Sequence, residues 1–154
     1  MDLSELIAPK AIIPVLKANS KKQVLQILAE KAAELTGLEG RAIFDIILQR
    51  EKLGSTCVGG GIAIPHGKLS DIDRIIGIFA RLETPVDFEA LDDEPVSLVF
   101  LLLAPENSGA DHLKALSQVA RVLRYSGISQ KLYNTNDVSV LYNLFVHHSE
   151  LSAA

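Results

Sequence analysis

The feature that most restricts the fold of this chain is the uninterrupted apolar run from Leu98 to Ala104. A helix that crosses a membrane needs about 20 apolar residues, and this run is far shorter. A short segment that is apolar at every position is typical of a strand whose sheet is covered on both faces. We therefore expect a strand over Val96–Ala104, in a sheet with helices on both sides.

Three other apolar segments are short enough to be strands. They lie at Ala11–Val15, Ile62–Ile64 and Ile75–Leu82. Pro65 directly follows the second segment and is expected to end it. The first of these strands stands apart in the sequence, whereas the others form one block in the middle of the chain.

Helical spacing of apolar residues predicts the remaining elements. Ser20 and Gly37 carry the start and stop signals of the first helix, and Ser108 is the expected cap of a helix that begins at Ala110. Because the helices group before and after the block of strands, the order favours an α+β fold with a mixed sheet over a strictly alternating one. The expected helices are 21–36, Glu39–Leu53, Ala110–Leu123, Gly127–Asn134 and Asp137–His147.

Composition excludes several classes of protein. A length of 154 residues suits one domain, 1–154, and a net charge of −4 lacks the basic excess that nucleic-acid binding requires. The single cysteine, Cys57, rules out an intramolecular disulfide and favours a reducing compartment, so we expect a cytoplasmic protein. The start of the chain, Met1–Glu5, is acidic and no apolar run follows it, so neither a secretion signal nor membrane insertion is expected.

The segment Pro65–His66–Gly67 is the first candidate for chemistry. Pro65 stiffens the backbone before the histidine and Gly67 removes a side chain after it, which displays the imidazole at an uncrowded site. Imidazole has a pKa of about 6.5, so at neutral pH most of it has a free lone pair that can attack phosphorus without a separate base. The same tripeptide, taken alone, also fits a solvated histidine in a turn.

Arg50 is the second candidate. It follows Ile43, Ile46 and Ile47 at helical spacing and therefore belongs at the edge of the buried face of its helix. A planar guanidinium at that place can bind a phosphoryl group with two donors. Alternatively, it extends to solvent and pairs with a nearby carboxylate.

His112 is the third candidate, because it lies in the first turn of its helix, where free N–H groups favour an anion. Ser55 and Thr56 can add hydroxyl donors, or can satisfy the backbone of their own turn. A metal site made by His66, His112 and Asp111 is a weaker alternative, because their spacing matches no common ligand motif. We therefore expect neither a metal nor a cofactor.

Two common catalytic motifs are absent. Gly54 and Gly59 have the spacing of the first half of a P-loop, but Gly60 and Gly61 occupy the positions where Lys and Ser or Thr are required. The sequence also has no Gly-x-Ser-x-Gly motif of an acyl hydrolase.

Three segments together resemble the mannitol/fructose-type IIA domain of the phosphoenolpyruvate-dependent phosphotransferase system: Arg50–Thr56, Gly59–Lys68 and Asp111–Leu113. The likeness is greatest to the nitrogen-regulatory branch of that family and covers nearly the whole chain. It implies a three-layer α/β/α sandwich with a mixed sheet. It also implies that His66 is phosphorylated, that His112 is the second active-site histidine and that Arg50 lies near the phosphoryl group.

The resemblance further implies the partners. A protein of this kind receives its phosphoryl group from a small HPr-like carrier, and the nitrogen-regulatory type signals to targets such as potassium transport and sensor kinases. Two alternatives stay open: a sugar-specific component that passes the group to a IIB domain, and a regulator that acts only by docking. Cys57 stands where small residues are usual in the family, and this difference neither supports nor weakens phosphoryl transfer.

Overall fold

The computed structural model describes residues 3–125 and 127–147. The expected order of one strand, two helices, a block of strands and three helices is confirmed, and α1, η1, β2 and β4 are additional to it. The elements in chain order are α1 (Leu3–Leu6), η1 (Pro9–Ala11), β1 (Ile12–Leu16), α2 (Lys21–Thr36), α3 (Gly40–Leu53), β2 (Cys57–Gly59), β3 (Ile62–Ala63), β4 (His66–Leu69), β5 (Ile76–Val86), β6 (Val96–Pro105), α4 (Ala110–Arg124), α5 (Ile128–Tyr133) and α6 (Val138–Val146).

The sheet is mixed, as expected. Its strand order is β1-β5-β6-β3-β2, and β4 also pairs with β6. β1 is parallel to β5, β5 is antiparallel to β6, and β3 and β4 are both parallel to β6. The strand β6 contains the apolar run, and every residue from Leu98 to Ala104 is at most 2 % exposed. This burial agrees with a strand that is covered on both faces.

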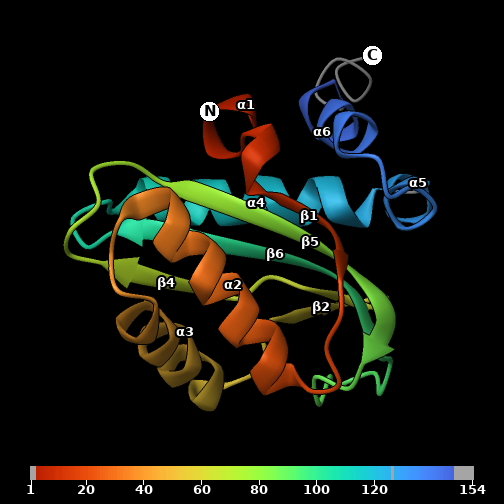
Figure 1. Cartoon of the computed structure of the whole chain (residues 1–154), viewed down its shortest axis with the longest axis horizontal. Helices are drawn as coiled ribbons and strands as arrows, with labels where there is room; N and C mark the ends of the chain where they lie inside the picture. Colours follow the sequence, from red (N-terminus) through yellow and green to blue (C-terminus); the bar gives the residue numbers. More distant parts are fainter. Residues whose placement is uncertain (1–2, 126, 148–154) are drawn as a thin grey trace.

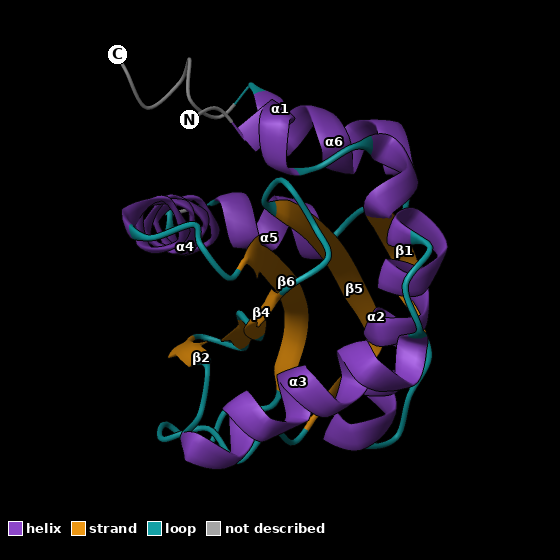
Figure 2. Ribbon diagram, turned by 90° about the vertical axis from the view of Figure 1, so that its left-hand side faces the viewer, coloured by secondary structure: helices purple, strands orange, loops and turns teal. Residues whose placement is uncertain are grey.

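Helices cover both faces of the sheet and make a three-layer α/β/α sandwich. The helices α2 and α3 lie in front of the sheet in Figure 1, and α4 lies behind it. Figure 2 shows α4 and α5 on the side of the sheet away from α2 and α3. Phe145 of α6 packs edge-on against Phe79 of β5 and Phe100 of β6, at ring distances of 4.9 and 5.7 Å. None of the helices in the described part of the chain has the length and apolarity that crossing a membrane requires.

The helix ends follow the sequence signals at most positions. The hydroxyl of Ser20 accepts a hydrogen bond from the Gln23 N–H, and Gly37 ends α2 with a left-handed φ of 76°. Asp137 caps α6 by accepting from two backbone N–H groups. The expected Ser108 cap is wrong: Gly109 is the N-cap residue of α4 and no side chain caps this helix. Gly109 has a φ of 57°, which favours glycine at this place.

The strand that follows β3 along β6 was not expected from the sequence. β3 ends at Ala63, one residue earlier than the expected Ile62–Ile64 strand, and the carbonyl of Pro65 accepts a hydrogen bond of 2.9 Å from the Leu102 N–H before pairing resumes in β4. There, His66 lies opposite Leu102 and Leu69 opposite Pro105. The residues 62–69 thus form one interrupted strand beside β6, of which the first part, β3, also pairs with β2. His66 is the first residue after the interruption.

Candidate functional site

The His66 ring is held in one tautomer. Its Nδ1 atom lies 3.0 Å from the carbonyl oxygen of Ile64, and a carbonyl can only accept, so Nδ1 carries the hydrogen. The Nε2 atom accepts a hydrogen bond of 3.2 Å from the Nε–H of Arg50, so Nε2 carries the lone pair. These two contacts agree with each other, and they place the lone pair of this half-buried imidazole on Nε2.

Arg50 reaches this atom from the last turn of α3. Its Nε–H points at His66, and its Nη1 donates a hydrogen bond of 3.0 Å to the carbonyl oxygen of Gly54. The second contact anchors the planar guanidinium to the loop that follows α3. The half-buried position at the edge of the helix's buried face agrees with the periodicity of the sequence.

His112 lies beside His66 and comes from the first turn of α4. The two ring centroids are 5.5 Å apart, with an angle of 57° between the ring planes. His112 is 8 % exposed, and its buried Nε2 has no hydrogen-bond partner among the described residues. Burial lowers the pKa of His112, and the nearby His66 and Lys68 lower it further. A pKa lowered in this way favours the neutral form of the second imidazole.

A shallow depression of about 410 Å³ opens over these side chains and is lined by both histidines and Arg50. Gly67 also lines the depression. A Cβ added at this residue would come within 2.9 Å of Cγ2 of Ile46 in α3. The missing side chain therefore lets α3, and with it Arg50, approach β4. The side chains of Leu53 and Leu113 are 85 % and 66 % exposed, in the last turn of α3 and the first turn of α4.

The two candidate hydroxyls make contacts within their own loop. Thr56 is buried, and its Oγ1 donates a hydrogen bond to the Oε1 atom of Glu51. The exposed Ser55 accepts a hydrogen bond of 3.1 Å from the Cys57 N–H. Burial raises the pKa of the Cys57 thiol. The structure therefore brings His66, His112 and Arg50 together, whereas these hydroxyls support the loop beside them.

Sequence reasoning missed three charged residues of this region: Lys68, Glu51 and Lys21. Lys68 lines the depression and lies two residues after His66 on β4, a spacing that places both side chains on one face of the strand. Glu51 is buried at the end of α3 and forms an ion pair with Lys21. Alternation along a strand could have found Lys68, but no local pattern indicates a buried glutamate.

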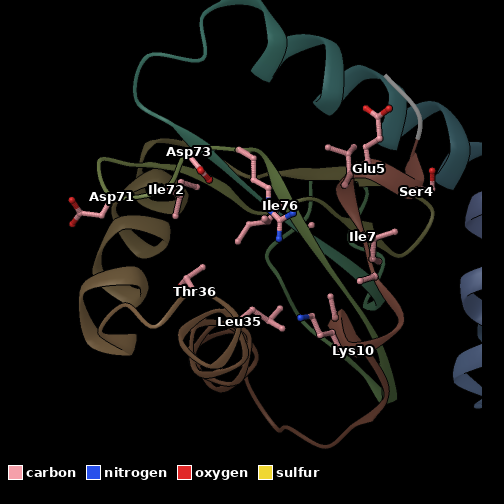
Figure 3. A pocket seen from close by; sticks show the side chains of 15 residues that line it. Ser4, Glu5, Ile7, Lys10, Leu35, Thr36, Asp71, Ile72, Asp73 and Ile76 are labelled. Carbon is pink, nitrogen blue, oxygen red and sulfur yellow. The ribbon is translucent and has the colours of Figure 1, made fainter.

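Within residues 3–125 and 127–147, other sites offer less chemistry. Among the described residues, no group of three or more His, Cys, Asp or Glu side chains is arranged to hold a metal ion. A pocket of about 300 Å³ lies between the N-terminal segment, the end of α2 and the loop between β4 and β5 (Figure 3). Its lining includes Lys10, Thr36 and Asp73 but neither histidine nor cysteine, so it has no imidazole or thiol nucleophile.

The fold and the site together define an α/β/α sandwich protein with two histidines and an arginine gathered at one surface depression. There, Nε2 of His66 accepts a hydrogen bond from the guanidinium of Arg50, and the ring of His112 lies with its centroid 5.5 Å from that of His66. The chain belongs to the EIIA 2 family of the phosphoenolpyruvate-dependent sugar phosphotransferase system, whose family pattern matches residues 5–148.

Individual relatives place the chain more narrowly within that family. It is 59 % identical to a nitrogen regulatory protein of Bradyrhizobium diazoefficiens, with 94 % of each chain covered. A nitrogen regulatory protein of Escherichia coli is 45 % identical, with 81 % of this chain and 77 % of the relative covered. The crystal structure of nitrogen regulatory protein IIA-Ntr from Neisseria meningitidis superposes with a TM-score of 0.88 at 32 % identity, over 93 % of this chain and 98 % of that one.

Proposed function

We propose that this IIA protein is the histidine phosphocarrier of a nitrogen-regulatory phosphotransferase system and that His66 Nε2 carries the phosphoryl group. The observation that supports this most directly is the fixed tautomer of His66. The Ile64 carbonyl holds the hydrogen on Nδ1, which leaves the lone pair of Nε2 on the side where Arg50 and His112 lie.

In the proposed transfer, Nε2 attacks the phosphorus of a phosphohistidine on an HPr-like donor. A new N–P bond forms, the donor's N–P bond breaks, and its electron pair returns to the donor imidazole, which keeps the hydrogen on its other ring nitrogen, so no proton has to be transferred. The Nδ1–H of His66 keeps its bond to Ile64 throughout. The Nε–H of Arg50 leaves the lone pair and donates to a phosphoryl oxygen, where its charge offsets the developing negative charge.

His112 contributes as a neutral donor in this scheme. With its hydrogen on Nε2, the buried ring can donate to a second phosphoryl oxygen, which would satisfy an atom that has no partner among the described residues. A cationic imidazole would hold the phosphoryl group more tightly and slow its release. The lowered pKa of His112 therefore suits a carrier that passes its group on.

The surface around the site suits a protein partner. The exposed side chains of Leu53 and Leu113 lie in the turns of α3 and α4 that also carry Arg50 and His112. An HPr-like donor can bury these two apolar side chains while its phosphohistidine enters the depression. Burying a leucine side chain contributes roughly 1.5–3 kcal/mol, which would favour such a complex.

The phosphorylation state would then act as the signal. A phosphoryl group adds about −1.5 to −2 charges at the centre of this surface and changes which partners bind it. The nitrogen regulatory relatives support a role in regulation, and we propose cytoplasmic targets such as potassium transport systems and sensor kinases. Transfer to a sugar-specific IIB domain is the competing function.

Labelling with phosphoenolpyruvate, the upstream enzyme and an HPr-like carrier tests this proposal. The wild-type protein should gain a label that is stable in base and lost in acid, and His66→Ala should gain none. His147→Ala is the matched control because His147 is an exposed histidine at the end of α6, and this variant should label normally. A label that persists in His66→Ala would refute the assignment of the acceptor.

A second measurement separates the signalling function from the alternatives. The labelled protein is mixed with candidate IIB domains, and the affinity for regulatory targets is compared before and after phosphorylation. Rapid transfer to a IIB domain would support the sugar-specific alternative. Equal affinities of the two states would support a regulator that acts by docking alone.

A further inference from the structure

We propose that Lys21, Glu51 and Thr56 form a buried positioning group that fixes the loop after α3 and, through it, the nucleophilic tautomer of His66. The inference deepens the proposed function, because it concerns the same imidazole. Two consecutive hydrogen bonds join the positioning group to the His66 ring, one from Ile64 N–H to the Thr56 carbonyl and one from His66 Nδ1 to the Ile64 carbonyl.

The group is centred on the Glu51 carboxylate, whose side chain is 3 % exposed. One oxygen, Oε1, accepts a hydrogen bond from the hydroxyl of Thr56. The other, Oε2, lies 2.8 Å from the Lys21 Nζ atom but has no well-aligned hydrogen-bond donor among the described residues. The Lys21 charge therefore compensates this buried oxygen, and a carboxylate that loses such compensation is costly to keep buried.

Lys21 is itself held in place. It lies in the first turn of α2, and its Nζ atom is 5.5 Å from the centre of the Phe88 ring, within the range of a cation–π contact. The Phe88 ring is fully buried. The positioning group thus connects α2, the end of α3 and the segment after β5.

The connection to the site runs through the backbone of Thr56. Its carbonyl oxygen accepts a hydrogen bond of 3.0 Å from the Ile64 N–H. The carbonyl of the same Ile64 accepts from Nδ1 of His66, also at 3.0 Å. Movement of Thr56 would therefore shift the carbonyl that selects the tautomer of His66.

The same loop also holds Arg50. The carbonyl of Gly54, two residues before Thr56, accepts the Nη1 hydrogen bond of the guanidinium. Arg50 and His66 therefore both depend on the segment 54–56, Arg50 through Gly54 and His66 through Thr56. Glu51 fixes this segment at Thr56. A network needed only for stability could be replaced by apolar residues at little cost. This network instead fixes the loop segment on which both functional side chains depend, which supports a positioning role.

The test compares Thr56→Val with Thr56→Ser. Valine keeps the shape of threonine but removes the hydroxyl, whereas serine keeps the hydroxyl. Thr36→Val is the matched control, because Thr36 also donates a hydrogen bond through its hydroxyl, 2.7 Å long, but at the end of α2. The readouts are the tautomer of His66 from ¹⁵N chemical shifts of the imidazole, the initial rate of phosphorylation and the thermal midpoint of unfolding.

We expect Thr56→Val to change the His66 ring from the Nδ1–H form to a mixture of tautomers. Phosphorylation should slow by about ten- to a hundredfold, as expected when a reacting group is displaced by up to about 1 Å. Thr56→Ser should stay within about twofold of the wild type. Thr36→Val should unfold at a lower temperature but keep the wild-type tautomer and rate.

Lys21→Met provides a second variant if Thr56→Val does not fold, since Lys21 lies near the surface with a side chain 23 % exposed. It should change the tautomer in the same direction. A wild-type tautomer and rate in these variants, with only the unfolding temperature lowered, would overturn the inference. The tautomer is measured without phosphoryl transfer, so failure of the proposed function and failure of this inference are distinguishable.

Discussion

Gly67→Ala is a sharp test of the geometry, because it should separate the two elements that carry the site. Gly67 lies on β4 directly after His66, and an added Cβ would come within 2.9 Å of Cγ2 of Ile46 in α3. Carbon atoms of this kind prefer separations of about 3.5–4.0 Å. The chain must therefore open by about 0.6–1 Å between β4 and α3, or Ile46 must rotate.

Rotation of Ile46 is unfavourable, because a β-branched side chain has one strongly preferred χ1 angle in a helix. Movement of the helix is then the easier response, and Arg50 lies one turn after Ile46 on the same face. Overpacking of this kind costs about 1–3 kcal/mol of stability. A displacement of about 1 Å between Arg50 and the reacting atom slows transfer by up to about a hundredfold.

The assay pairs the initial rate of phosphorylation by the HPr-like carrier with thermal unfolding. Gly40→Ala is the control: it adds the same methyl group to α3, where the new Cβ meets Cβ of Ala33 at an ordinary 3.6 Å. That variant should transfer at the wild-type rate. If Gly67→Ala transferred at the wild-type rate although its unfolding temperature fell, the claim that this close approach sets the position of Arg50 would be refuted.

Two further predictions concern the neighbours of His66. Arg50→Lys should slow phosphorylation by roughly ten- to a hundredfold, because one ammonium cannot bond both His66 and the Gly54 carbonyl, and a lost bond to a charged group costs about 1.5–3 kcal/mol. An unchanged rate of phosphorylation in this variant would contradict the role of the two guanidinium hydrogen bonds. For His112, the folded-state pKa is lowered, so the unfolded chain binds more protons and stability is lost as the pH falls below about 6.5. Denaturant unfolding at pH 7.5 and 5.5 should show a smaller acid loss in His112→Gln than in the wild type, and an equal loss would disprove this origin.

The order of the elements could be predicted because the local signals are strong. The apolar run in β6 and the terminal signals Ser20 and Gly37 each rest on a few neighbouring residues. The strands β2 and β4 were missed because they are short, and β4 contains Gly67 and Lys68 instead of an apolar pattern. Partners distant in sequence stabilise them: β4 exists because it pairs with β6.

A site residue could be predicted where its neighbours in sequence indicate that it is accessible. It could not be predicted where its role depends on a contact with a residue distant in sequence. His66 stands between Pro65 and Gly67, so its display is a local property. The partnership of Arg50 with the Nε2 atom, by contrast, spans 16 residues. The buried Glu51 has no sequence signal, because its compensation comes from Lys21 in another helix.

The interruption between β3 and β4 explains the position of the proposed nucleophile. A residue before proline is restricted to extended conformations, so Pro65 fixes the backbone of Ile64 as well as its own. The carbonyl of Ile64 turns to the His66 ring two residues later, while the Pro65 carbonyl takes over the pairing with Leu102. An uninterrupted strand would direct successive carbonyls alternately to either side of the ladder, with none returned to a side chain of the same strand. The break therefore frees one backbone acceptor to hold a proton on Nδ1, and the lone pair of Nε2 faces Arg50 as a consequence.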